Sequence, residues 1–500
     1  MHPHSMFPEA VYREQEVKKY RGNRWIEALP PILEKEEAVD RMQKLVQVDE
    51  AERAAPAQVR MHMVEDIAKS FLQPLDAHVG LFSTVSVLIR GGYVHRDPSR
   101  PEFICTLLEG ARQLEASTGS ETPQQNMGPG SGHALVGMSG VGKSTAIEAV
   151  LRCYPQVIWH PRMHGSLRSV LQVVWLKLSC PHDGSIKELC HLFFEEVDRL
   201  LGTDYKSVYA AKSTTTNRLR SGMARVAFIH GLGLLVVDEI QNLNEAKSGG
   251  DRLMMNFFKI LRDVMKVPML LIGTNAAVSV LGGDFQVARR HAGIPLFEPM
   301  KPDDNFEFFL EGLFEAQYLR SPVAVTPSIV KLLYDLSQGI TDIVVQLFTQ
   351  AQSRALACGI EELSDVLFKE VYDDCFGLLH PFLEAMRNGH NVSDGIWDAA
   401  MLIARNAASK SAALPRAVPR IQQTAAKALP VQPGPAQATA RISKKVSGVK
   451  KRVFRRRSGE ESLCKLVQVA QEAIRNEVPV HGALWEAGFI RSLGGEALRA

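Results

Sequence analysis

The sequence predicts an α/β fold in which a doubly wound, parallel five-stranded sheet is followed by a compact helical lid. Three observations support it. Short apolar runs alternate with helical patterns from residue 132 to about 275, a glycine-rich turn joins the first run to a helix, and only amphipathic helical patterns continue from 303 to 378. A helical N-terminal region and a disordered, basic C-terminal tail complete the expected architecture.

Apolar runs mark the strands of the predicted sheet. The strand candidates are 134–136, 157–160, 173–178, 234–238 and 269–273, and the helical patterns between them are 143–151, 185–201, 217–229 and 252–265. Strands that alternate with helices form parallel crossover units, so we expect helices on both faces of the sheet. A ligand of such a sheet binds at the carboxyl ends of the strands.

The glycine-rich turn after the first strand fits the phosphate-binding pattern G-x-x-x-x-G-K-[ST]. Its backbone N–H groups and the first turn of the following helix would form a cup for the phosphates of ATP. Lys143 would reach the terminal phosphate, and the Ser144 hydroxyl would bind Mg²⁺. The expected nucleotide contacts are Gly137, Ser139, Gly140, Val141, Gly142, Lys143, Ser144 and Thr145. For this loop alone, a glycine-rich turn before a core helix remains an alternative.

A second motif lies about ninety residues further on, where the apolar run 234–238 ends in Asp238 and Glu239. Asp238 would hold Mg²⁺ through water, and Glu239 would accept a proton from the attacking water. Acids at strand ends are often only helix caps. Following a phosphate loop, however, the pair favours a magnesium and ATP site.

The next strand ends in a polar pair, and either Asn275 or Thr274 would orient the attacking water. Arg289 and Arg290 follow at the distance that, in ring-forming ATPases, brings arginines to the subunit edge. We expect at least one of them to reach a neighbour's γ-phosphate, although a solvated helix face is the alternative. The lid turn at 339–342 has no basic residue where many such ATPases place an arginine that contacts the nucleotide.

The pattern along the chain predicts five segments. They are a helical N-terminal region (1–115), a nucleotide-binding core (132–300), a helical lid (301–380), a flexible basic linker (381–459) and a C-terminal docking motif (460–500). The linker is rich in Ala, Pro, Gln and Lys and has few large apolar residues, whereas 460–476 regains helical periodicity.

The composition fits a globular cytoplasmic protein with no membrane contact. The seven cysteines are scattered without a C-x-x-C pair, so we expect reduced thiols and no metal besides Mg²⁺. No apolar run reaches the roughly 18 residues of a membrane-spanning helix. Between Asp398 and Glu460 the chain has no acid and 14 basic residues. Removing those charges from the formal net charge of +3 leaves −11 on the remainder, so the tail is expected to attract polyanions.

Several stretches of the chain resemble the TnsC family, the AAA+ ATPase regulators of multi-subunit cut-and-paste DNA transposons. The resemblance covers roughly residues 20–350 and rests on the phosphate loop together with Tyr20-Arg21-Gly22-Asn23, Glu27-Ala28-Leu29-Pro30, Leu88-Ile89-Arg90-Gly91-Gly92-Tyr93, Tyr154-Pro155-Gln156-Val157-Ile158, Val174-Trp175-Leu176-Lys177, Leu200-Leu201-Gly202-Thr203-Asp204-Tyr205 and Asp238-Glu239-Ile240-Gln241-Asn242-Leu243. The last two motifs are the most selective.

The resemblance implies an ATPase of the bacterial cytoplasm that assembles on double-stranded target DNA as a ring or filament. Its N-terminal region would meet a target-selector protein and its C-terminal tail the transposase subunits. ATP hydrolysis would drive disassembly, because ATP favours the assembled state by differential affinity. The candidate DNA-phosphate contacts are Lys187, Lys206, Lys212, Arg218 and Arg220, although each also fits a solvated helix face. A replication initiator or helicase loader is the main alternative function, and a nucleotide-held signalling scaffold is a third.

Overall fold

The computed structural model describes residues 7–94, 96–97, 132–161, 169–211, 214–245, 250–263, 266–281, 286–287, 297–390, 397–398, 400–401 and 403–404. All of these residues belong to one unit, which comprises residues 1–414. Most of the predicted basic linker and the whole predicted docking motif lie outside the described residues. Within these ranges, no helix has the length and apolar character needed to cross a membrane.

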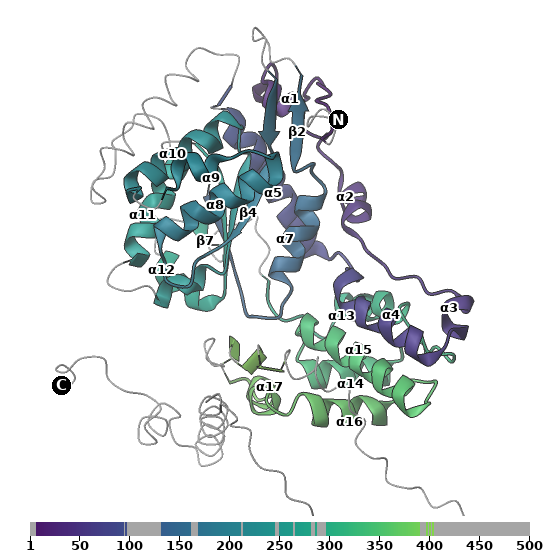
Figure 1. Ribbon diagram of the computed structural model, residues 1–500. Helices are drawn as coiled ribbons and strands as arrows, with labels where there is room; N and C mark the ends of the chain where they lie inside the picture. The colour runs from purple at the N-terminus through teal and green to yellow at the C-terminus, as the bar shows by residue number, and fades with distance from the viewer. Residues whose placement is uncertain are drawn as a thin grey trace, which may run out of the picture. The chain divides into compact units, whose positions relative to one another are not determined.

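The central sheet has five parallel strands, which confirms the predicted fold class (Figure 1). The strands are β1 (Gly132–Val136), β4 (Trp175–Ser179), β5 (Leu234–Asp238), β6 (Met269–Gly273) and β7 (Gln286–Val287). Their order in space is β4-β5-β6-β1-β7. The register sets Val136 beside Gly273 and Ser179 beside Asp238. The carboxyl ends of these strands therefore lie along one edge of the sheet.

One predicted strand of this sheet is wrong. Residues 157–160 form β2 (Val157–His160), but β2 pairs antiparallel with β3 (Val170–Val173) in a separate two-stranded sheet. The buried His160 ring bonds Gln172 on β3 and Tyr12 from the N-terminal segment, at 2.8 Å each. A short apolar run predicts a buried strand but does not specify its partner. The fifth strand of the main sheet is β7, whose two residues are too few to show a period.

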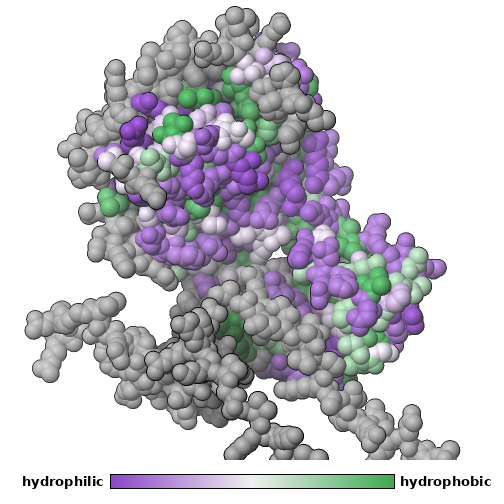
Figure 2. Space-filling view, viewed as in Figure 1, coloured by the Kyte–Doolittle hydropathy of each residue, from purple (hydrophilic) through white to green (hydrophobic). Residues whose placement is uncertain are grey.

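Helices cover both faces of the main sheet because neighbouring side chains along each strand point to opposite sides. Leu235 and Val237 of β5 pack into a core with α8 (Ile186–Leu201), α10 (Thr216–Ile229) and α11 (Gly250–Asp263). Leu234 and Val236 pack on the other face with α7 (Lys143–Arg152) and α5 (Asp76–Val94). The outer surface over α8 and the short α9 (Tyr205–Tyr209) is mainly hydrophilic, as Figure 2 shows.

The helices of the N-terminal region divide between two cores. The short helices α1 (Arg24–Glu27) and α2 (Lys35–Met42) pack with α5 against the sheet. In contrast, α4 (Ala57–Ser70) packs on the lid, where Val64 and Ile67 are fully buried. The exposed helix α3 (Glu50–Ala54) precedes α4. The N-terminal region is therefore a part of both the nucleotide-binding core and the lid.

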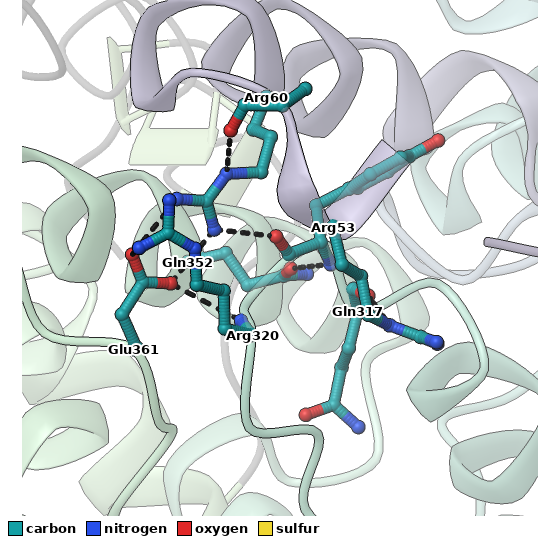
Figure 3. Close-up of polar contacts among 8 residues, drawn as sticks. Arg53, Arg60, Gln317, Arg320, Gln352 and Glu361 are labelled. Atoms are coloured by element: carbon teal, nitrogen blue, oxygen red, sulfur yellow. Dashed lines mark hydrogen bonds and ion pairs between the residues drawn. The ribbon is translucent and has the colours of Figure 1, made fainter. Parts of the chain in front are cut away.

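A buried arginine connects α4 to the lid (Figure 3). Arg60 is 1% exposed, and its guanidinium donates two hydrogen bonds to the carboxylate of Glu361, both 2.8 Å long. It also donates to the carbonyl oxygen of Tyr318 at 2.9 Å. The hydrogen bonds from Arg60 lower the pKa of Glu361 to about 2. A buried, bidentate pair of this kind fixes orientation as well as contributing energy.

The lid consists of α13 (Asp304–Phe314), α14 (Pro327–Ser337), α15 (Thr341–Cys358), α16 (Asp365–Cys375) and α17 (His380–Arg387). The first four helices match the amphipathic patterns of the sequence. The prediction that a flexible linker begins at 381 is wrong, because α17 crosses that boundary and Leu383, Trp397 and Met401 are buried in the lid core. Trp397 packs edge-on against Phe382 of α17, with ring centroids 6.2 Å apart.

Candidate nucleotide-binding site

The phosphate loop joins β1 to α7 as its motif predicts. Gly140 and Gly142 adopt left-handed backbone conformations, with φ angles of +89° and +88°. Such angles are costly for residues with a Cβ atom, so this loop path depends on glycine. Ser139, Gly140, Val141, Gly142, Lys143, Ser144 and Thr145 line a cavity of about 550 Å³. Gly137 lies at the base of the loop, where its carbonyl oxygen accepts a hydrogen bond from Lys143.

Lys143 begins α7 and turns back onto the loop. Its side-chain Nζ donates to the carbonyl oxygens of Gly137 and Met138, at 2.8 and 2.7 Å. The residue is only 8% exposed, although it lines the cavity. The ammonium group is therefore held at the mouth of the loop, where a phosphate oxygen would lie.

Asp238, at the end of β5, contacts the phosphate loop. The Ser144 hydroxyl donates to Oδ2 of Asp238 at 3.0 Å, although the two residues are 94 positions apart. A hydroxyl and a carboxylate side by side supply the oxygen ligands that Mg²⁺ takes alongside water and phosphate. The arrangement therefore fits a magnesium ion bound with a nucleoside triphosphate.

Lys177 of β4 lies behind this pair. Its Nζ is 3.2 Å from Oδ2 of Asp238 and 2.7 Å from Oε1 of Glu148. Burial alone would lower the pKa of Lys177, but the hydrogen bond to Glu148 and the charge of Asp238 raise the pKa above its usual value. The side chain therefore stays cationic and orients the carboxylate of Asp238. In the sequence Lys177 belongs to the motif Val174-Trp175-Leu176-Lys177, but no local pattern shows that its side chain reaches Asp238.

Glu239 follows Asp238 in a strained backbone conformation. Its φ is +58°, a left-handed value that is uncommon for a residue other than glycine. Its N–H donates to Oδ1 of Asp238 at 2.9 Å, and its exposed side chain lines the cavity. Strain of this kind persists where the surroundings enforce it, often at functional sites. The side chain is thus directed to the solvent-accessible mouth of the cavity.

The structure distinguishes between the two candidates at the end of β6. Thr274 lines the cavity, and its Oγ1 is buried without a hydrogen-bond partner among the described residues. Asn275 instead begins a short 3₁₀ helix (Asn275–Ala277) and is not among the cavity-lining residues. A buried, unpartnered hydroxyl beside a polar cavity is suited to binding water or a ligand oxygen. Thr274 is therefore better placed than Asn275 to orient the attacking water.

His78 and Phe297 also line the cavity, and neither carries a local sequence signal for this role. His78, at the start of α5, is packed edge-on against Phe297, with ring centroids 5.8 Å apart. Its Nδ1 accepts a hydrogen bond from the backbone N–H of Leu75 at 3.1 Å. Burial lowers the pKa of His78 to about 4, so the ring is neutral near pH 7. These two uncharged rings in the cavity lining suit contact with a planar, neutral group.

The remaining predicted site residues have different outcomes. Arg289, Arg290 and Lys212 lie outside the described residues. Lys187 and Arg218 are exposed on α8 and α10, and Lys206 is exposed and paired with Glu195. Arg220 is only 5% exposed and stacks on the ring of Phe257, and burial lowers its pKa. The predicted DNA contact of Arg220 is therefore wrong, because its guanidinium faces the protein core.

The fold and the site define a P-loop nucleotide-binding protein of the α/β class. Comparison with known families narrows the class further, since residues 129–281 match a family model described as an AAA domain. This part of the chain therefore has the fold of an AAA+ domain. No match was found among curated proteins.

Solved structures of several proteins resemble this chain, among them the following three. A Walker-type ATPase of Pyrococcus abyssi is 18% identical over 58% of this chain and 77% of its own, with a TM-score of 0.33. The Aeropyrum pernix Orc1 protein in complex with DNA is 17% identical over 65% and 85%, with a TM-score of 0.34. Cdc6p from Pyrobaculum aerophilum is 14% identical over 62% and 80%, with a TM-score of 0.30. Likeness at this level does not distinguish one AAA+ function from another.

Proposed function

We propose that this protein is an ATP-dependent regulator of DNA transposition, which assembles on target DNA and links a target-selector protein to the transposase. The contact between Ser144 and Asp238 carries the ATPase part of the proposal, because it joins the two sequence motifs in one cavity. The similarity to the TnsC family motifs carries the transposition part. The proposal therefore has a chemical half, which is ATP hydrolysis, and a biological half, which is assembly on DNA and the control of transposition.

In the chemical half, some residues of the cavity bind ATP and Mg²⁺ and others act on the attacking water. The N–H groups of the phosphate loop and the ammonium of Lys143 bind the phosphates. Ser144 and Asp238 hold Mg²⁺, which when bound neutralises charge on the phosphate oxygens. Glu239 accepts the proton of the attacking water, and the Thr274 hydroxyl orients that water. His78 and Phe297 are the candidates for contact with the base, since both are uncharged rings that line the cavity.

In this proposal, assembly brings a positively charged side chain of a neighbouring subunit to the ATP site. The charge that develops on the transferred phosphate calls for a cation beyond Lys143, and an arginine from a neighbouring subunit can raise the rate by roughly 10³–10⁵. Arg289 and Arg290 are the candidates on sequence grounds. Because the site is then complete only between two copies, ATP binding favours the assembled state and hydrolysis favours release.

DNA binding would involve the exposed basic residues of α8 and α10. Replacing both Lys187 and Arg218 by alanine should weaken DNA binding and flatten the plot of log Kd against log salt concentration by about 0.9 for each phosphate that the protein no longer neutralises. Lys331→Ala, which changes an exposed lysine of α14 in the lid, is the matched control and should leave the slope unchanged. An equal slope for both variants would exclude this surface as the DNA contact.

One experiment tests both halves of the proposal. ATP turnover of the full chain is measured with and without linear duplex DNA, and filaments are sought by electron microscopy in a slowly hydrolysed ATP analogue. We expect DNA to stimulate turnover and the analogue to give DNA-bound filaments. Turnover without any assembly would retain the ATPase and remove the transposition regulator. A separate assay tests the replication-initiator alternative: stimulation of helicase loading by the full chain, with no effect on transposition, would favour it.

A further inference from the structure

Two backbone carbonyl groups of the phosphate loop accept hydrogen bonds from the lid and from the segment that follows it. The indole N–H of Trp397 donates to the carbonyl oxygen of Ser139 at 3.0 Å. The next carbonyl of the loop, that of Gly140, accepts from the Thr341 hydroxyl at 3.1 Å and from the Asp342 N–H at 3.0 Å. Two consecutive peptide groups of the loop are thus bound by the lid and by the segment that follows it.

These contacts determine the direction of the loop N–H groups. In a planar trans peptide the C=O and the N–H point in opposite directions. When Trp397 holds the carbonyl of Ser139, the N–H of Gly140 must point away from the indole. In the same way, the bonds to the Gly140 carbonyl set the direction of the Val141 N–H. Loops that bind phosphate do so through backbone N–H groups aimed at the anion.

Packing around the same contact leaves the loop little freedom to rotate. Trp397 is fully buried in the lid core. A Cβ atom on Gly140 would lie 2.9 Å from Cε of Met401 and 3.0 Å from Cγ2 of Ile340. Met401 is four positions beyond Trp397 in the chain, so this segment meets the loop with both a donor and an apolar side chain.

We propose that Trp397 is a positioning residue for the phosphate loop, and that its indole N–H preorganises the loop to bind the phosphates of a nucleoside triphosphate. This inference rests on the proposed ATP site and adds to it a determinant outside the phosphate-loop and acidic motifs. Since binding free energies are reciprocal, bound nucleotide also stabilises the attachment of the Trp397 segment to the loop. The chain continues from this segment into the stretch from Arg405 to Arg457, which contains 14 basic residues and no acid.

The test compares two tryptophan-to-phenylalanine variants of the full chain. Trp397→Phe keeps an aromatic ring and removes the donor. Trp25→Phe is the matched control, because Trp25 is 1% exposed and its indole N–H has no hydrogen-bond partner among the described residues. Affinity for a fluorescent ATP analogue is titrated in the presence of Mg²⁺. We expect roughly 3- to 10-fold weaker binding for Trp397→Phe, the usual effect of removing one hydrogen bond, and wild-type binding for Trp25→Phe.

Two further readouts separate positioning from a general loss of stability. KM for ATP should rise in Trp397→Phe while kcat at saturating ATP stays within about twofold, because the chemical step does not use Trp397. Unlabelled ATP should change the intrinsic tryptophan fluorescence of the wild type and of Trp25→Phe, but not that of Trp397→Phe. If Trp397→Phe fails to fold, benzothienylalanine at position 397 retains the bicyclic shape without the N–H and replaces it in every comparison.

Equal affinity for the ATP analogue in the two variants would overturn the inference. Absence of analogue binding by the wild type would instead overturn the proposed ATP site. The two failures are therefore distinguishable.

Discussion

The helices α4 and α5 are neighbours in sequence but are attached to the rest of the protein in different ways. Helix α5 packs on the sheet through apolar side chains such as Leu81 and Val85. Helix α4 packs on the lid and adds the ion pair between the buried Arg60 and the half-buried Glu361. Apolar contacts are non-directional, whereas a bidentate ion pair requires one geometry. Helix α5 also has a directional bond, from the Tyr93 hydroxyl to the carbonyl oxygen of Gly231 at 2.6 Å, so the bidentate ion pair is the feature particular to the lid attachment.

The chain between these helices crosses from the lid to the sheet beside the cavity. Phe71, Leu72, Gln73 and Leu75 all line the cavity, and Phe71 packs edge-on against Phe309 of the lid at 5.5 Å. The cavity therefore has a sheet side, which holds the acids and the phosphate loop, and a lid side, which helps to set its shape. The difference suggests that chemistry and domain orientation can be disrupted separately.

The largest expected effect is on the sheet side. Glu239→Gln removes the proposed proton acceptor, so kcat should fall by about 10²–10⁴. Affinity for ATP should change little, and neither helix attachment should be affected. Steady-state turnover and nucleotide titration measure the two quantities. Glu298→Gln, which changes another exposed acid of the same cavity, is the control and should retain turnover. More than a tenth of normal turnover in Glu239→Gln would contradict the assignment.

The next effect is on the lid side. Glu361→Ala leaves the Arg60 guanidinium buried without its carboxylate, which should cost about 3–5 kcal/mol of the free energy of unfolding. The control is Asp374→Ala, which breaks the more exposed pair with Arg354 in the same lid and should cost about 0–1 kcal/mol. Urea denaturation measures both. Equal losses would show that the burial of Arg60 does not increase the contribution of its ion pair to the free energy of unfolding.

Lowering the pH should reduce the free energy of unfolding in two steps, because His78 on the sheet side and Glu361 on the lid side titrate in different pH ranges. The folded-state pKa of His78 is about 4, below its usual 6.5, so the unfolded chain binds the proton more readily. Its contribution to stability is complete above pH 6.5 and falls by up to about 1.4 kcal/mol per pH unit between 6.5 and 4. Denaturation of the wild type and of His78→Gln over this range should show the steeper loss in the wild type. Parallel curves would count against a buried, neutral His78.

Glu361 responds at lower pH. Its folded-state pKa of about 2 lies below the ordinary 4.5, so its contribution is present above pH 4.5 and is lost as the pH falls toward 2. Glu361→Gln should therefore lose less stability than the wild type over that window.

The smallest effect concerns the water-orienting position. Thr274→Val keeps the shape of the side chain and removes the hydroxyl, so kcat should fall roughly 3- to 10-fold with little change in KM. Thr274→Ser retains the hydroxyl and should keep near-normal turnover. If Asn275→Ala is more damaging than Thr274→Val, the assignment of Thr274 is wrong.

Much of the sheet side was predictable from local sequence. Gly137 to Thr145 and Asp238 to Glu239 are short motifs whose spacing and flanking apolar runs indicate both the fold and the chemistry. The same local signals failed for 157–160, since an apolar run does not reveal its partner strand. They also failed for Arg220, because a basic residue in a helical pattern gives no sign that it stacks on Phe257.

The sequence by itself determined that this chain has a parallel sheet with a phosphate loop and a paired acidic motif. Each of these features can be recognised from a short run of consecutive residues. Only the tertiary structure decided what meets them. Arg60 is 301 positions from Glu361, and Trp397 is 258 positions from Ser139. No local pattern encodes such pairings, because burial and packing of the whole domain bring the partners together. The lid side of the site is for this reason visible only in the folded chain.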